Sequence, residues 1–261
     1  MILVFIFLYA PIFVLIVFSF NSSKSRSVWT GFSFKWYEQL FHNSSILNAL
    51  LITLLVSVLA ALIATIIGTF AAIGFYTMKK KWRKPLLAVN NIPLINADIV
   101  TGVSLCLLFV ASGNLLGFGL GFGTLLIAHI TFNIPYVILS VMPKLYQLDV
   151  NLIDAAQDLG CTWMQAFWKV VIPEIKSGLV NGALIAFTMS IDDFVISYFT
   201  AGHVQTLSML IYSMTRKRIT PEINAVSTLL FVCVLVLLIV VNVRESRQED
   251  KLKKKALAAS K

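Results

Sequence analysis

Six apolar stretches constrain what this chain can fold into, because each is close to the length needed to cross a bilayer. They occupy residues 2–20, 46–76, 86–109, 122–142, 179–199 and 225–243. A helix needs about 20 residues to span roughly 30 Å of hydrocarbon. The composition agrees, since 58% of the residues are hydrophobic and 13% are charged, against about 25% charged in ordinary soluble domains. We therefore predict an all-α polytopic membrane protein with six transmembrane helices.

Lysine and arginine are divided unevenly between the two sides that six spans define. With both termini in the cytoplasm, 15 of the 21 basic residues fall on the inner side. The outer ones are Lys24, Arg26, Lys35, Arg216, Lys217 and Arg218. Because basic residues concentrate in cytoplasmic loops, this orientation is the predicted one, and the net charge of +9 requires no nucleic-acid partner. Nothing in the sequence explains the outer cluster at 216–218.

A polar interruption at residues 154–173 predicts two short helices joined by a turn. Two pairs have the spacing of a capping box: Asn151 with Asp154, and Thr162 with Gln165. Gly160 lies between them, where a positive φ commonly closes a helix. Pro173 cannot continue the second helix, because it has no N–H to donate. The predicted orientation puts this segment in the cytoplasm, and the alternative is an amphipathic hairpin on the membrane surface.

Three carboxylates within the predicted spans give the main indication of what crosses. They are Asp98, Asp192 and Asp193. An ionised acid near the bilayer centre costs about 2.5–3.5 kcal/mol on insertion scales, so such residues are usually functional. No lysine or arginine occurs within the six stretches. Carboxylates that face a water-filled path would therefore favour a cationic substrate.

The adjacent acids are expected to have different roles. On an unbroken helix Asp193 shares a face with Ser190, whereas Asp192 points about 100° away. We expect one acid to contact the substrate, and the other to pair across a subunit interface or cap a broken helix. The alternatives are structural: contacts between helices for this pair, and irregular backbone around residues 90–96 for Asp98.

The chain carries no motif for chemistry of its own. A loop of the form G-x-x-x-x-G-K-[ST], which would cradle the phosphates of ATP, is absent. His129 lies in an apolar stretch without a second ligand nearby. We therefore expect a hydrogen-bonded helix histidine rather than a metal site.

The 154–173 segment resembles the cytoplasmic signature of ATP-binding-cassette (ABC) importer permeases. The matching residues are Asp154, Ala155, Ala156, Gly160, Val170, Ile172 and Pro173. The family usually has Glu at the first of these positions. Further motifs resemble the second permease subunit of spermidine/putrescine importers over nearly the whole chain. These are F-N-S-S-K at 20–24, K-W-Y at 35–37, H-I-T-F at 129–132, S-I-D-D at 190–193, I-Y-S-M at 211–214 and P-E-I-N-A at 221–225.

This resemblance implies a type I ABC importer permease fold (MetI-like) in a bacterial cytoplasmic (inner) membrane. Residues 1–243 would form the permease domain, with a coupling loop at about 144–176, and 244–261 a flexible basic cytoplasmic tail. ATPase coupling would fall on Asp154, Ala155, Ala156, Gly160 and Pro173. The substrate path would include Trp36, Asp98, Ser190, Asp192 and Asp193. Trp36 would offer a cation–π face to an ammonium group, or serve as an interfacial anchor.

The implied partners are a second homologous permease, two ATPase subunits and an extracytoplasmic polyamine-binding protein, all in or next to membrane lipid. The ATPase subunits would bind ATP and Mg, and this chain would need no cofactor. One alternative is an ABC permease for another solute, such as an amino acid or iron. The other is a secondary transporter that uses Asp192 and Asp193 as proton or sodium sites and needs no ATPase.

Overall fold

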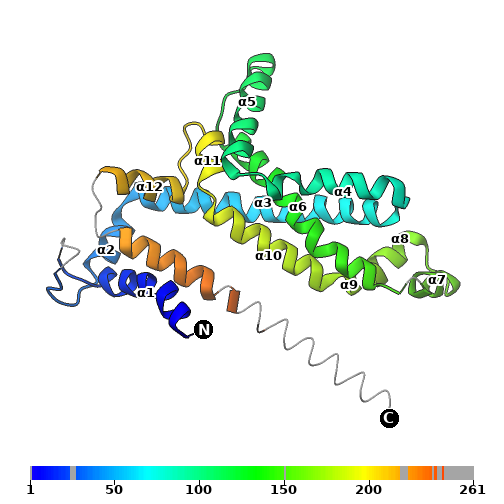
Figure 1. Ribbon diagram of the computed structural model, residues 1–261, viewed down its shortest axis with the longest axis horizontal. Coiled ribbons are helices and arrows are strands. Elements are labelled where there is room, and N and C mark those ends of the chain that lie inside the picture. Colours follow the sequence, from blue (N-terminus) through cyan, green and yellow to red (C-terminus); the bar gives the residue numbers. More distant parts are fainter. Residues whose placement is uncertain are drawn as a thin grey trace, which may run out of the picture. The chain divides into compact units, whose positions relative to one another are not determined.

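The computed structural model describes residues 2–23, 28–149, 151–217, 223–236, 238, 239 and 243. Within these ranges the regular structure is helical, apart from an isolated antiparallel bridge between Asn21 and Phe32 (Figure 1). The chain forms two compact units, one of residues 1–50 with 210–261 and one of residues 51–209. Lys24, Arg26, Arg218 and the tail 244–261 lie outside the described residues.

The first unit contains α1 (Ile2–Ser19), α2 (Lys35–His42) and a helix at Ile223–Val236. A cluster of aromatic side chains lies between α1 and α2 in the sequence and extends into α2. The ring of Phe20 contacts Phe32, Phe34 and Tyr37, with centroids 5.1 to 5.5 Å apart. Two further helices, α3 (Ser44–Thr77) and α12 (Leu207–Lys217), contribute residues to both units.

Three helices of the described chain are long and apolar enough to cross a membrane. They are α3, α5 (Asp98–Leu116) and α6 (Phe122–Gln147). A fourth arises if the bent pair Trp163–Glu174 and Lys176–Asp192 forms one span, with 67° between its parts. The stretches predicted at 2–20, 46–76 and 122–142 correspond to single helices.

Two of the predicted spans have wrong boundaries, because the helical backbone is interrupted inside each of them. The stretch 86–109 is divided between α4 (Lys80–Ile95) and α5, and the backbone of Asn96 and Ala97 is extended between them. Asn and Pro have low helix propensity and crowd the end of α4, which favours a break there. The stretch 179–199 is also divided: α10 (Lys176–Asp192) ends inside it, the backbone of Asp193 is extended, and α11 (Val195–Thr200) follows.

The second unit has α6 and α10 at its core, packed closely through small residues (Figure 1). Every fourth residue of α10 on this face is small: Gly178, Gly182, Ala186 and Ser190. A Cβ atom on Gly178 would lie 2.9 Å from the carbonyl oxygen of Ser140. Such rows of small residues let helix backbones approach in membranes. This packing fixes the end of α10 against the N-terminal half of α6.

The short helix α11 joins α5 to this core. It packs on both α5 and α6, and a Cβ atom on Gly102 of α5 would lie 3.4 Å from the Cα of Ile196. Figure 1 shows α5 projecting from the rest of the second unit. The ends of α4 and α10, the start of α5 and all of α11 therefore come together around one place.

Candidate functional site

A cavity of about 250 Å³ lies where these helix ends meet. Its lining includes all the acids that the sequence singled out within the spans: Asp98, Asp192 and Asp193. Aromatic side chains from α6 and the helix break, Phe132, Tyr136 and Phe194, line it as well. None of the lining residues is a lysine or an arginine. The cavity is therefore a small acidic compartment with apolar and aromatic walls.

Asp98 is the first residue of α5, directly after the break that separates this helix from α4. The N-terminal turn of a helix favours a negative charge, because its N–H groups are unpaired and the helix dipole is positive there. The Asp98 side chain is exposed and makes no hydrogen bond to another described residue. Its carboxylate is thus free to receive a donor from within the cavity.

Asp192 and Asp193 differ in their surroundings, as the sequence predicted. Asp192 is the exposed last residue of α10 and makes no hydrogen bond to another described residue. The Asp193 carboxylate instead accepts from the Ile196 N–H at 3.2 Å, and from the Ser197 N–H at 2.7 Å and hydroxyl at 2.9 Å. Of the alternatives offered for the second acid, the cap of a broken helix is the one that fits Asp193, because its carboxylate accepts two N–H groups in the first turn of α11.

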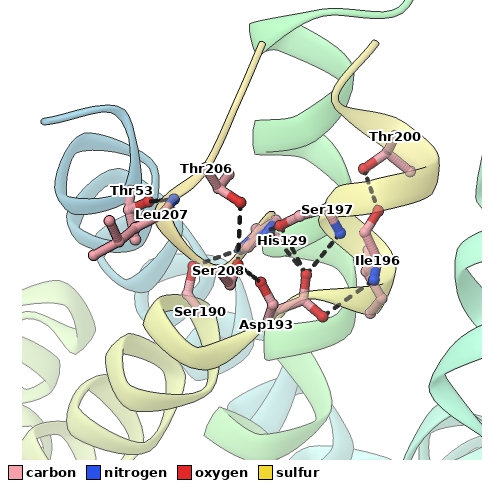
Figure 2. Close-up of polar contacts among 10 residues, drawn as sticks. All are labelled: Thr53, His129, Ser190, Asp193, Ile196, Ser197, Thr200, Thr206, Leu207 and Ser208. Atoms are coloured by element: carbon pink, nitrogen blue, oxygen red, sulfur yellow. Dashed lines mark hydrogen bonds and ion pairs between the residues drawn. The ribbon is translucent and has the colours of Figure 1, made fainter. Parts of the chain in front are cut away.

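The predicted face shared by Ser190 and Asp193 on one helix is wrong, because α10 ends at Asp192 and the Asp193 backbone is extended. The two side chains meet through a third residue instead. His129 of α6 is 1% exposed and bonds Ser190 Oγ through Nδ1, and Ser197 Oγ through Nε2 (Figure 2). The expected hydrogen-bonded histidine is confirmed. Ser190 lies beside this histidine and is not among the residues that line the cavity.

Sequence reasoning did not single out the aromatic lining. Phe132 and Tyr136 are four residues apart on α6 and so share a face, and Phe132 is three residues from His129. This spacing is the only signal that could have found them, and it becomes informative only when the histidine is known to face the break. Ser197, which bonds both His129 and Asp193, carried no signal in the sequence.

The polar segment at 151–174 forms the predicted helix–turn–helix. Helix α7 (Asn151–Asp158) is followed by a turn at Leu159 and Gly160, and the φ of Gly160 is +85°. The Gly160 N–H donates to the Gln157 carbonyl at 2.8 Å, and the Cys161 N–H to the Ala156 carbonyl at 3.0 Å. These two bonds form a Schellman motif, in which the glycine takes the left-handed conformation without a Cβ clash. The predicted glycine turn is confirmed.

The two capping predictions in this segment have different outcomes. Thr162 and Gln165 form a reciprocal capping box at the start of α8 (Trp163–Ala166), as predicted. The box expected from Asn151 and Asp154 is wrong, because Asn151 is the first residue of α7 and Asp149 accepts its N–H at 3.0 Å. A carboxylate two residues earlier thus provides the cap.

Pro173 does not end the second helix, so that prediction is also wrong. Helix α8 continues through a π-helical turn, η1 (Phe167–Val171), into α9 (Ile172–Glu174). Within this turn the Ile172 N–H donates to the Phe167 carbonyl, five residues back. Because a π turn rearranges the bonds just ahead of the proline, the helix passes through Pro173 before it bends into α10.

The outer face of this helix pair is exposed and partly apolar. Asp154 and Ala155 are exposed on α7. Leu159 in the turn is 87% exposed, and Trp163 of α8 is 59% exposed. Gathered apolar side chains of this kind mark either a surface that another protein covers or one that contacts the membrane.

Comparisons with known proteins identify the family. Residues 64–254 match the family described as "Binding-protein-dependent transport system inner membrane component". The chain belongs to this family. It is therefore an inner-membrane component of a binding-protein-dependent transport system, which argues against a carrier that works alone.

Curated relatives of this inner-membrane component are permease proteins. The chain is 38% identical over 230 residues to the putrescine transport system permease protein PotI of Escherichia coli K12, covering 87% of this chain and 82% of PotI. It is 38% identical over 237 residues to the spermidine/putrescine permease PotC of the same organism, covering 90% and 88%. The Haemophilus influenzae PotC is 35% identical over 240 residues, covering 92% of both chains.

Solved structures confirm the fold of this inner-membrane component. A bacterial ABC transporter that imports the acidic polysaccharide alginate superposes with a TM-score of 0.69 at 15% identity, covering 92% of this chain and 93% of that one. An amino acid ABC transporter gives 0.57 at 19% identity, covering 81% and 98%. At these identities the likeness concerns the fold alone.

Trp36, the remaining predicted site residue, lies in the first unit. Its side chain is 2% exposed, and its indole N–H donates to the Asn21 carbonyl at 2.6 Å. The Lys35 ammonium lies 5.8 Å from the ring centroid. In this arrangement the indole is a hydrogen-bonded core side chain, and its place in a substrate path stays a prediction.

Proposed function

We propose that this inner-membrane component is a permease subunit of an ATP-driven ABC importer that carries polyamines into the cell. The observation that carries the proposal is the meeting of Asp98, Asp192 and Asp193 around one cavity whose lining has no lysine or arginine. Carboxylates in a low dielectric attract ammonium groups strongly. The names of the relatives, which refer to putrescine and spermidine, support the same class of substrate.

In this proposal the free carboxylates of Asp98 and Asp192 receive the ammonium groups of the substrate. They belong to different helices, α5 and α10, so an extended cation with spaced charges can contact both. Phe132, Tyr136 and Phe194 offer aromatic faces to the remaining charge and to the methylene groups. Asp193 and Ser190 take part by holding the helix break, and Trp36 belongs to the path outside this cavity.

Coupling to ATP hydrolysis is assigned to the 151–174 helix pair. Asp154, Ala155, Ala156, Gly160 and Pro173 shape this pair, and its exposed face with Leu159 and Trp163 would dock on an ATPase subunit. Because the pair bends by 67° into α10, a displacement of the loop acts directly on the helix that ends at Asp192. The 144–176 region is thus the coupling loop of the proposal.

The proposed membrane arrangement has six spans: α1, α3, α5, α6, α10 and the helix at residues 223–236. Both termini then face the cytoplasm, and the coupling loop lies on the same side, as the distribution of lysine and arginine favours. Residues 1–243 would form the permease domain and 244–261 a basic cytoplasmic tail. The protein would be a multi-pass component of a bacterial cytoplasmic membrane.

The complete importer would contain a second homologous permease, two ATPase subunits and an extracytoplasmic polyamine-binding protein. The ATPase subunits would bind ATP and Mg, and this chain would hold no cofactor and catalyse no reaction. Closure of the ATPase pair would move the coupling loops and switch the cavity between the two sides of the membrane. The permease supplies the path and the coupling.

The test is uptake of labelled spermidine and putrescine by cells that lack polyamine transport and express the whole importer. A second strain carries a hydrolysis-deficient ATPase partner with the same permease. Uptake that requires the active ATPase is the expected result. Uptake that persists with the inactive partner would overturn the ATP-driven mechanism, and absence of polyamine uptake would overturn the substrate class.

A further inference from the structure

The polar contacts around His129 form a chain with a defined direction. The Ser197 hydroxyl donates its single hydrogen to Asp193 Oδ2 at 2.9 Å, so it must accept in its 3.0 Å contact with His129 Nε2. The ring hydrogen therefore lies on Nε2. With one hydrogen on the ring, Nδ1 accepts from the Ser190 hydroxyl at 2.5 Å. Three hydrogen bonds thus point in one direction: Ser190 donates to His129, His129 donates to Ser197, and Ser197 donates to Asp193.

This series of hydrogen bonds joins three helices across the break between α10 and α11. Ser190 lies two residues before the end of α10, His129 is in the N-terminal third of α6, and Ser197 is in the first turn of α11. Figure 2 shows the imidazole between the two serines, with Asp193 beside Ser197. His129 Nε2 is also 3.5 Å from Asp193 Oδ2. A single side chain thus holds both sides of the break from the neighbouring helix.

The main chain at the break is anchored from another direction as well. The Ser208 hydroxyl donates to the Asp193 carbonyl at 2.7 Å, and the Leu207 N–H donates to Thr53 Oγ1 of α3 at 2.8 Å. These contacts fix the backbone position of Asp193. They do not set the direction of its carboxylate, which is held by the Ile196 and Ser197 N–H groups and by the Ser197 hydroxyl that His129 contacts.

The hydrogen bonds around His129 give the adjacent acids Asp192 and Asp193 different roles at the cavity. Because Asp193 is engaged with α11 and the histidine chain, its carboxylate is turned toward protein donors. Asp192, one residue earlier, has no such partner among the described residues and lines the cavity. Loss of these hydrogen bonds would let Asp193 turn and α11 shift, which changes the part of the cavity wall that Val195 and Ile196 form.

We propose that His129 is a positioning residue for transport: by bonding Ser190 and Ser197, and through Ser197 the Asp193 carboxylate, it fixes the α10–α11 break and so presents the Asp192 carboxylate to the substrate. This inference rests on the proposed function for its substrate readout. His129 itself contacts no substrate, since it is buried and is not among the residues that line the cavity. Its effect is on the binding geometry, so it should alter the KM of uptake more than the maximal rate.

The test compares His129→Leu with a matched control, Asn133→Leu, in the complete importer. Asn133 lies one turn further on the same face of α6, is equally buried, and its amide has no partner among the described residues. We expect His129→Leu to raise the KM for spermidine about tenfold, the order expected for one lost buried hydrogen bond, while ATP hydrolysis and assembly stay within about twofold. Asn133→Leu should leave the KM unchanged.

A conservative series separates positioning from bulk packing. The His129→Gln amide reaches the position of Nε2 and can donate to Ser197. The KM of this variant should therefore lie close to the wild-type value. The shorter His129→Asn side chain reaches only the Ser190 side, so the KM of that variant should stay raised. If His129→Leu prevents assembly, Ser197→Ala breaks the same chain with a smaller change and should raise the KM. The proposal is overturned if Ser197→Ala or His129→Leu behaves like the Asn133→Leu control.

Hydrogen exchange of the Ile196 and Ser197 amides gives a readout without substrate, because both amides donate to Asp193. Their exchange should be faster in His129→Leu than in wild type and near the wild-type rate in His129→Gln. Absence of polyamine uptake by the wild-type importer would count against the proposed function, and this exchange comparison would still decide the role of His129. Equal exchange in all variants would refute that role.

Discussion

The adjacent acids Asp192 and Asp193 should respond differently to the same isosteric change. Asp193→Asn replaces a carboxylate that accepts three hydrogen bonds with an amide that has one oxygen. Either the Ile196 N–H or the two Ser197 donors then lose their acceptor. An unsatisfied buried donor costs about 1–3 kcal/mol, so the free energy of unfolding of the complex should fall by about that amount.

Asp192→Asn breaks no hydrogen bond within the described chain. The thermal stability of this variant should therefore match wild type, and only its affinity for the substrate should fall. A hydrogen bond to a charged group contributes about 1.5–3 kcal/mol, which corresponds to roughly a 10- to 100-fold rise in KM. The assay pairs thermal unfolding of the purified importer with the concentration dependence of labelled spermidine uptake.

The same two measurements show how the reasoning would fail. A stable Asp193→Asn with only a raised KM would mean that Asp193, and not Asp192, contacts the substrate. A destabilised Asp192→Asn would mean that the exposed acid has a structural partner in the assembled importer. Asp192→Asn with unchanged KM would remove this carboxylate from the path.

Three further predictions follow from other parts of the second unit. Asp154→Lys should reduce substrate-stimulated ATP hydrolysis while leaving delivery by the binding protein intact, and normal hydrolysis would exclude Asp154 from the docking face. Gly178→Ala should impair folding and lower the yield of importer, because the new Cβ would lie 2.9 Å from the Ser140 carbonyl oxygen. Gly74→Ala is the matched control. It should be tolerated, because a Cβ at Gly74 meets nothing within 4 Å. Asn133→Leu should leave thermal stability unchanged or raised, because it removes an amide that is 0% exposed with no partner among the described residues; a clear loss of stability would reveal a partner for that amide.

The helices and their apolar character follow from the sequence, but the positions of two interruptions do so only in part. The break at Asn96 falls where the sequence offered irregular backbone as an alternative, and the break at Asp193 falls at the acid pair for which a broken helix was one possibility. Asn, Pro and Asp near a helix end are compatible with either a continuous helix or a cap, and packing of α11 against α5 and α6 decides between them. Sequence reasoning offered the cap as one possibility for the pair and could not assign it.

The acids of the cavity were found because charge is rare in such spans, and their meeting was not predicted. Asp98 is more than 90 residues from Asp192 in the chain. Only the break before α5 and the end of α10 bring them to one cavity. Helix caps show the same limit on a smaller scale. The Thr162 cap was predicted correctly. Asn151 is not a cap, because it is already the first residue of α7 and its N–H donates to the Asp149 carboxylate.

If the carboxylates of the cavity carry a polyamine, the double variant Asp98→Asn with Asp192→Asn should abolish transport. The measurement is ATP-driven uptake of labelled spermidine by the importer reconstituted in lipid vesicles with its binding protein. We expect uptake to fall to the level without ATP, while the complex assembles and binds ATP normally. Uptake at the wild-type rate and KM would contradict this expectation.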